Sequence, residues 1–328
     1  MKRITRITAL ICLIAIAASL FAGCGNSKEK VVIWTSGEDY KNEYYLSECR
    51  KKFPDYDIVL EYMNSSTIAQ KVVEEGDRCS ADIIVSEEYG YLNKCEDHLA
   101  VLDDFDYSVF IDEIVPESHK FTPECKNGGC VIVNVKKLQE KGLEIPTSYS
   151  DLLKPEFKGL ISMPSPKSSG TGYMFLRQLT NEWGEDRAFE YFDEFSNNVL
   201  QYTSSGSGPV NALIAGEVAV GLGMTSQAVF KINEGNTDLK TIFFDEGSPY
   251  SMYGSAILKK SADRKAVTDV FNYLATDLCR ADNEMYFPDR LYKDFAPTIE
   301  GFPTNIKYGN MSNDTQAEKE RLLAKWDH

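Results

Sequence analysis

Val31-Val32-Ile33-Trp34 opens the repeating pattern that decides the fold of this chain. Two more short apolar runs follow it, Ile58-Val59-Leu60 and Ile83-Ile84-Val85. The segments between them have helical character, because residues 39–53 carry an apolar stripe and Ser66 can cap a helix that ends near residue 76. Strands that are apolar throughout and alternate with helices predict a parallel sheet covered on both faces.

The second half of the chain repeats this alternation. We predict strands over residues 159–163, 199–202, 218–222 and 255–258, and helices over 173–179, 209–215 and 267–274. Thr315 and Glu318 form a capping-box pattern that opens a last helix, which runs to Trp326.

The length of the chain predicts two lobes. About 300 residues remain after the N-terminal leader described below, more than one hydrophobic core usually supports. We expect an α/β architecture with parallel-rich sheets flanked by helices, and residues 127–134 and 250–257 as the two hinge strands. Lobe 1 would comprise residues 31–126 and 250–288, and lobe 2 residues 127–249 and 289–328.

Residues 1–23 have the composition of a secretory signal. A positive start with three basic residues precedes an almost wholly apolar run over residues 7–22, which is short for a membrane span. Small residues then precede Cys24, and residues 24–30 form a polar tether. This end resembles the lipobox of bacterial lipoproteins, which implies cleavage before Cys24 and its lipidation. The body would then lie outside the cytoplasmic membrane, held by lipid alone; an ordinary cleaved leader is the alternative.

Acidic residues outnumber basic ones, 50 to 35. Loss of the three basic residues of the leader takes the formal charge from −15 to −18. This charge argues against nucleic acid as a partner, because proteins bind phosphate backbones with clustered cations. It favours a protein that stays monomeric.

Six cysteines remain beyond Cys24: Cys49, Cys79, Cys95, Cys125, Cys130 and Cys279. An exported protein can form disulfides, and the connectivity does not follow from the sequence. Cys125 and Cys130 flank Lys-Asn-Gly-Gly, which has the composition of a hairpin turn, so they are the first pair to test. Buried free thiols are the alternative. The spacing fits no zinc motif, and we predict no metal site.

Three loops rich in serine and glycine stand at the ends of predicted strands, at residues 35–37, 165–172 and 203–209. Small residues let backbone N–H groups approach a ligand, and helix N-termini favour anions. Ligands of open α/β sheets bind at the carboxyl ends of the strands. We therefore predict an oxyanion pocket, and its candidate residues are Ser36, Ser168, Ser169, Gly170, Thr171, Ser205, Gly206, Ser207 and Thr225.

Other strand ends carry carboxylates: Glu38 with Asp39, Glu87 with Glu88, and Asp245 with Glu246. An anion seat on one side of a cleft and carboxylates on the other would suit a zwitterion. Tyr250 and Tyr253 lie in a predicted hinge strand and are candidates for closing over a ligand.

Catalysis finds little support in the sequence. The three histidines lie away from any nucleophile motif, and the GxSxG, HExxH and protein-kinase patterns do not occur. We predict no catalytic residues and no cofactor. A surface-anchored hydrolase of a phosphorylated solute is the rival from another functional class.

Over nearly all of its mature length the chain resembles the extracellular solute-binding lipoproteins of bacterial ABC importers, in the ferric-iron and phosphonate/sugar-phosphate group. The matching segments are residues 32–36, 81–85, 146–159, 168–173 and 215–222, of which Pro146 to Gly159 is the most specific. The resemblance implies a two-lobed periplasmic-binding-protein fold of type II that closes on its ligand and docks on permease subunits. A sensor subunit that signals lobe closure is a further alternative.

The resemblance leaves the ligand open. Ferric-iron members carry two adjacent tyrosines just after the strand that matches residues 218–222, where this chain reads Gly223-Met224-Thr225-Ser226-Gln227. We therefore favour a small anionic or zwitterionic solute, a phosphonate such as 2-aminoethylphosphonate or a phosphate ester, over ferric iron. Thiamine stays an alternative.

Overall fold

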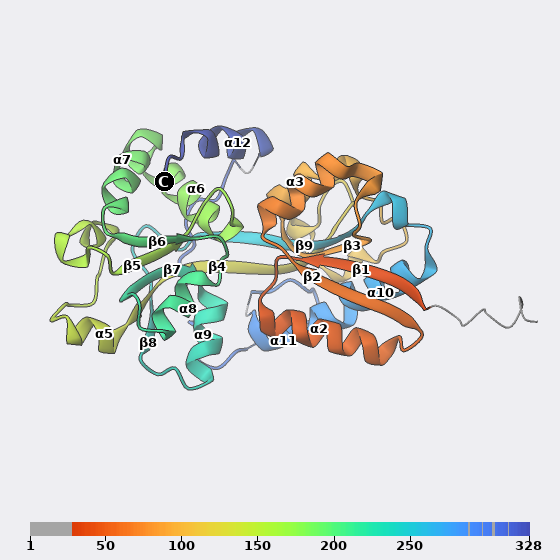
Figure 1. The fold of residues 1–328 in the computed structure, drawn as a ribbon, viewed down its shortest axis with the longest axis horizontal. Helices are drawn as coiled ribbons and strands as arrows, with labels where there is room; N and C mark the ends of the chain where they lie inside the picture. Colours follow the sequence, from red (N-terminus) through yellow and green to blue (C-terminus); the bar gives the residue numbers. More distant parts are fainter. Residues whose placement is uncertain (1–27, 288, 297, 304–305, 314) are drawn as a thin grey trace, which may run out of the picture.

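The computed structural model describes residues 28–287, 289–296, 298–303, 306–313 and 315–328. The predicted signal segment and Cys24 lie outside these residues. The described chain forms two α/β lobes joined by two long strands (Figure 1). Among the described helices, none has both the length and the apolar character that a membrane span requires.

Lobe 1 begins with the three predicted strands. β1 (Glu29–Thr35) lies between β2 (Tyr56–Tyr62) and β3 (Ile83–Glu88) and is parallel to both. The helices of this lobe are α2 (Asp39–Lys52), α3 (Ser65–Glu75), α4 (Tyr89–Lys94), α10 (Lys265–Tyr273) and α11 (Cys279–Tyr286). α2 and α10 pack on one face of the sheet and α3 and α4 on the other, as the apolar strands predicted.

Lobe 2 has the same architecture. Its strands are β5 (Ile161–Pro164), β6 (Val199–Thr203), β7 (Val220–Met224) and β8 (Leu239–Ile242), and β5 is parallel to β6 and β7. Its helices are α5 (Val135–Glu140), α6 (Gly170–Trp183), α7 (Glu185–Ser196), α8 (Gly208–Ile214), α9 (Thr225–Asn233) and α12 (Gln316–Lys325).

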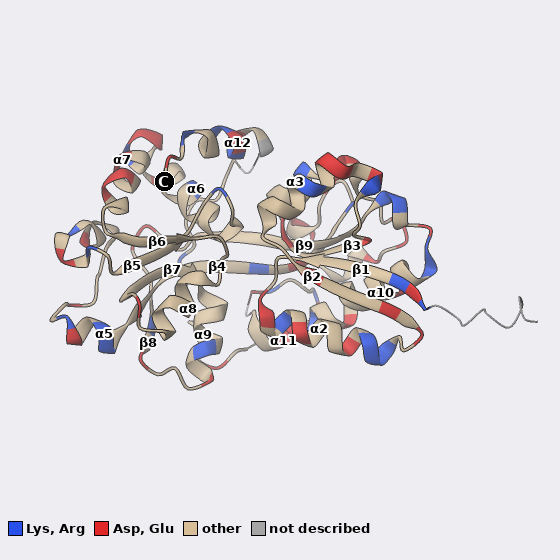
Figure 2. Cartoon of the chain, in the orientation of Figure 1, with Lys and Arg blue, Asp and Glu red and all other residues tan. Residues whose placement is uncertain are grey.

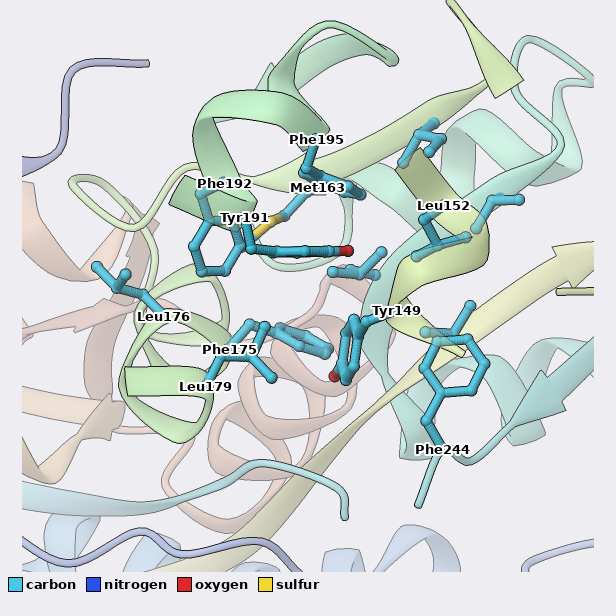
Figure 3. Close-up of a cluster of buried hydrophobic side chains, with 14 of the residues drawn as sticks. Tyr149, Leu152, Met163, Phe175, Leu176, Leu179, Tyr191, Phe192, Phe195 and Phe244 are labelled. Atoms are coloured by element: carbon cyan, nitrogen blue, oxygen red, sulfur yellow. The ribbon is translucent and has the colours of Figure 1, made fainter. Parts of the chain in front are cut away.

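The core of lobe 2 is aromatic. Tyr149, Tyr191 and Phe244 pack edge to face, with ring centroids 4.9–5.8 Å apart (Figure 3). α6, α7 and α12 contribute to this core, whereas α8 and α9 cover the opposite face of the sheet. Burial of such large side chains is the main source of stability for the lobe that carries most of the serine loops.

Two antiparallel strands, β4 (Thr122–Asn134) and β9 (Tyr250–Ile257), connect the lobes. One sheet therefore runs through the molecule in the order β2-β1-β3-β9-β4-β7-β5-β6, with β8 beside β4. β4 pairs with β9 up to Gly128 and with β7 from Gly129 onward. β4 starts five residues before the predicted strand, and its one basic residue, Lys126, lies where the chain crosses between the lobes (Figure 2).

The hairpin turn expected between Cys125 and Cys130 is wrong, and this pair, the first to test for a disulfide, does not form one. Residues 125–130 do not turn but continue β4, so the two cysteines lie roughly 17 Å apart along an extended strand. A disulfide needs Cα atoms within about 7 Å. Cys125 packs in the small cluster with Tyr253, and Cys130 packs on the α8 side of lobe 2. All six cysteines of the described chain are buried free thiols, which was the alternative.

The C-terminal part returns to lobe 2 later than residue 289. Leu291 and Tyr292 still pack on lobe 1 with Phe110 and Cys279. α12 then docks on lobe 2, and half of the predicted capping box is present: Thr315 Oγ1 accepts a hydrogen bond from the N–H of Glu318, whereas the Glu318 carboxylate binds Arg321.

Candidate functional site

A small cavity lies between the two lobes. Its volume is about 50 Å³, room for a compact group of a few heavy atoms, since one buried water needs roughly 10–15 Å³. Lobe 1 contributes Ser36, Gly37, Glu38, Tyr40, Lys41, Tyr62, Asn64, Ser65, Ser86 and Phe287; the hinge strands contribute Glu124, Cys125, Asn127 and Tyr253; lobe 2 contributes Ser168, Ser169, Gly170, Thr171, Ser204, Ser205, Gly206, Met224 and Ser226.

Helix N-termini from both lobes converge on this cavity, and those of lobe 2 are bare. α6 begins at Gly170 without a side-chain cap and without an acidic residue in its first turn. α9 begins at Thr225 in the same way. The first N–H groups of a helix have no partner within the helix and carry partial positive charge. Lobe 2 therefore presents unpaired donors to the cavity.

The lobe 1 helices α2 and α3 differ, because a carboxylate or a side-chain cap lies at the start of each. Glu38 precedes α2 and Asp39 lies in its first turn, so negative charge offsets the positive end of α2 although neither side chain caps it. Asn64 caps α3 by accepting a hydrogen bond from the N–H of Thr67 at 2.9 Å. The predicted cap, Ser66, lies inside α3 instead and donates to the Asn64 side chain. Lobe 1 thus offers fewer free donors than lobe 2.

Two side chains of the cavity lining add donors without a strong acceptor. The hydroxyl oxygen of Ser168 is buried and has no hydrogen-bond partner among the described residues. The amide nitrogen of Asn127 donates only to the Met224 sulfur, 2.7 Å away, and a thioether is a weak acceptor. The Asn127 side-chain oxygen accepts from Ser226 at 2.9 Å, which fixes the amide orientation.

The serines of lobe 1 form a chain in which each hydrogen is already used. Ser65 donates to Ser36 at 3.1 Å, and Ser36 donates to the backbone oxygen of Ser86 at 2.6 Å. The Ser86 hydroxyl donates to Glu124 at 2.6 Å. Ser86 has a φ of 56°, a left-handed conformation that costs a serine roughly 1–3 kcal/mol. Ser36 can therefore act toward the cavity as a hydrogen-bond acceptor, because its own hydrogen is already donated to Ser86.

A buried ionic cluster closes the lobe 1 side. The Lys41 ammonium lies 2.5 Å from Glu124 and 2.7 Å from Asp282, and all three side chains are at most 5% exposed. Burial raises the pKa of Asp282 to about 6, against the opposing effect of Lys41. For Glu124, Lys41 and two serine hydroxyls outweigh burial and hold the pKa below its ordinary value. Among the described lining residues Lys41 is the only cation. Its charge is already paired with the carboxyl groups of Glu124 and Asp282.

Contacts across the cavity show that the lobes are closed on each other. The Ser207 side chain lies near the Glu38 carboxyl, and the Ser205 side chain lies near the Tyr62 hydroxyl. The ring centroids of Tyr40 and Phe230 lie 4.5 Å apart.

The structure brings most of the predicted site residues together. Eight of them line the cavity: Ser36, Ser168, Ser169, Gly170, Thr171, Ser205, Gly206 and Tyr253. The loops at 168–172 and 203–208 touch, because a Cβ on Gly206 would lie 2.4 Å from the Thr171 hydroxyl.

Three predicted residues lie outside the lining. Ser207 is one position beyond it, at the rim with Glu38. Thr225 is fully buried behind Met224 and Ser226. Tyr250 packs against Tyr308 and the Lys126 ammonium instead, because residues three apart in a strand point to opposite faces and Tyr253 takes the cavity face.

Sequence reasoning missed several lining residues. Tyr62 ends β2, a parallel strand, and Asn64 and Ser65 follow it, so their position was a usable signal. Glu124 and Asn127 gave no local signal, since they reach the cavity only through the pairing of β4 with β9.

No group of three or more His, Cys, Asp or Glu side chains within the described residues is arranged to hold a metal ion. Met224 ends β7 and Thr225 and Ser226 follow it, at the place where the ferric-iron resemblance would require tyrosines.

Comparisons with known proteins agree with this geometry. A family model described as bacterial extracellular solute-binding protein matches residues 107–288. An uncharacterized protein of Haemophilus influenzae is 28% identical over 250 residues, 73% of this chain and 70% of the relative.

Two solved structures have the same fold. The periplasmic binding protein P5PA has a TM-score of 0.80 and 20% identity over 91% of this chain and 98% of its own. AfuA from Actinobacillus pleuropneumoniae, with fructose-6-phosphate bound, has a TM-score of 0.81 and 21% identity over 92% and 98%. The predicted two-lobed type II periplasmic-binding-protein fold is thereby confirmed.

Proposed function

The chain belongs to the bacterial extracellular solute-binding proteins, and from this membership we propose that it captures a small oxyanionic solute by lobe closure and delivers it to an ABC importer. The solute is a phosphonate, such as 2-aminoethylphosphonate, or a small phosphate ester. Lipid on Cys24 holds the receptor at the outer face of the cell membrane, and the receptor acts as a monomer.

The proposal of an oxyanionic solute rests on one observation: the uncapped N-terminus of α6 lies beside the Ser168 hydroxyl, which has no hydrogen-bond partner among the described residues. An unpaired buried donor costs roughly 1–3 kcal/mol, which an acceptor bound in the cavity would recover. An oxyanion supplies several acceptor lone pairs in a small volume. The small volume of the cavity favours a compact phosphonate over a sugar phosphate or thiamine.

A thermal-shift panel of 2-aminoethylphosphonate, sugar phosphates, thiamine and ferric citrate tests the proposal. A solute at 100 times its Kd stabilises the protein by about 2.7 kcal/mol, which raises Tm by roughly 5–10 °C for a chain of this size. A shift with the phosphonate or a phosphate ester is the expected result. A shift with ferric citrate alone, with a phenolate colour, contradicts the ligand assignment.

Ser168→Ala should weaken binding of the responding solute about tenfold, because a hydrogen bond to a charged group is worth about 1.5–3 kcal/mol. Isothermal titration calorimetry measures the change. Ser47→Ala, on the exposed side of α2, is the matched control and should leave Kd unchanged. If the Ser168→Ala and wild-type proteins bind the solute with equal affinity, the Ser168 hydroxyl does not contribute to the site.

Turnover is the point on which a hydrolase would differ from a receptor. We expect the phosphorus NMR spectrum of the bound solute to stay unchanged over long incubation with stoichiometric protein. Appearance of free phosphate in proportion to protein concentration would favour the hydrolase.

A further inference from the structure

The two sides of the cavity differ in hydrogen-bonding character. On the lobe 2 side, Ser168 and the first turns of α6 and α9 present donors. On the lobe 1 side, the hydrogens of Ser36 and Ser65 are committed within the serine chain, and Glu38 adds a carboxylate. A plain oxyanion would accept from the donors of the first side and would meet the Glu38 carboxylate on the second.

The charges around Glu38 make this asymmetry electrostatic. Lys41, three residues further along α2, is held by Glu124 and Asp282. Lys231, on α9 of the facing lobe, pairs with Glu234 at 2.7 Å. Both ammonium groups act on Glu38 through space, but each is paired with other carboxylates, and the Ser207 hydroxyl near Glu38 carries no charge. A dianionic ligand enclosed here would lie close to the Glu38 carboxylate, and such repulsion is costly in a closed, poorly hydrated cleft.

We propose that Glu38 is a specificity residue that binds an ammonium group on the solute while the oxyanion sits on the N-terminus of α6. The solute class is then an amino-substituted phosphonate or phosphate ester of short chain length, oriented with its anion toward lobe 2 and its cation toward lobe 1. This inference rests on the proposed function and assigns the second end of its ligand. Glu38 reaches both the ligand and Ser207, so the ammonium would also strengthen contact between the lobes.

Three phosphonates of similar size separate charge from shape: 2-aminoethylphosphonate, 2-hydroxyethylphosphonate and propylphosphonate. Calorimetric titration of each into wild-type protein and Glu38→Gln compares every ligand with itself, so ligand protonation cancels. We expect Glu38→Gln to lose about tenfold or more in affinity for the amino compound and less than about threefold for the other two. Glu43→Gln, one turn further along α2 and exposed, should change none of them.

Each other outcome overturns part of the account. If all three affinities fall together, Glu38 only shapes the cleft and the inference fails. If the affinities for the amino and hydroxyl compounds fall together, Glu38 binds a neutral donor and the ammonium assignment fails. In both cases the phosphonate still binds and the proposed function stands. If the wild-type protein binds none of the three, the phosphonate assignment of the proposed function falls together with the inference.

Discussion

Replacing Lys41 with methionine is expected to destabilise the protein by about 3–5 kcal/mol, the cost of removing one partner from a buried ion pair. Glu124 and Asp282 would both stay buried without their cation. Typical stability is about 5–15 kcal/mol, so the loss is a large fraction of the total. Urea denaturation at neutral pH measures it. The same cluster holds Ser86 in its left-handed conformation through Glu124, so ligand affinity should fall too.

The stability lost by Lys41→Met should depend on pH. Loss of Lys41 raises the folded-state pKa of both carboxyls above the unfolded values. Groups with raised folded pKa stabilise the fold at low pH, and that stability is lost as pH rises. The penalty of Lys41→Met should therefore be larger at pH 8 than at pH 5. Lys51→Met, on the same helix but 69% exposed in its side chain, should cost less than about 1 kcal/mol. A penalty for Lys41→Met no larger than this control would contradict the cluster.

Replacing Lys319 with methionine is expected to cost a similar 3–5 kcal/mol. The Lys319 ammonium lies 2.5 Å from Glu88, with side chains 2% and 1% exposed. It also stands 3.5 Å from the centroid of the Tyr91 ring and 4.6 Å from that of Tyr173. Lys319 belongs to α12 on lobe 2 and Glu88 to β3 of lobe 1, so the pair joins the two lobes.

A double variant distinguishes the contribution of the Lys319–Glu88 ion pair to stability from that of the packing of α12. Adding Glu88→Leu to Lys319→Met removes the stranded carboxylate and should restore most of the lost stability, because apolar replacement of both partners is often neutral. Lys325→Met, on the same helix with a side chain 53% exposed, is the control and should cost less than about 1 kcal/mol. If Lys319→Met matches Lys325→Met, or if the double variant is no better than the single one, the buried pair does not contribute as described.

Much of the fold could be read from short apolar runs. β1, β2 and β3 contain Val31 to Trp34, Ile58 to Leu60 and Ile83 to Val85. β1 and β3 are buried on both faces where these runs lie, so they show no polar alternation, whereas β2 is a partly buried edge strand. β4 could not be bounded in this way, because Pro123 and the Gly128-Gly129 pair imitate a turn within a strand. Pairing with β9 and β7 overrides that local preference.

The site was predictable to the extent that it lies at strand ends. Ser168, Gly170 and Gly206 follow parallel strands, and the topology brings such ends together. The direction of a hydroxyl hydrogen was not predictable, and it decides that Ser36 offers lone pairs while Ser168 offers a donor. The Lys41 cluster was missed because its members come from α2, β4 and α11, which meet only in the folded protein.

A crystal structure of the protein with 2-aminoethylphosphonate tests the central claim most directly. The account predicts phosphonate oxygens at about 2.7–3.2 Å from the Ser168 hydroxyl and the N–H groups of Gly170 and Thr171, with the amine toward Glu38. Phosphonate density seated instead against Lys41 on lobe 1, or outside the space between the lobes, would contradict it.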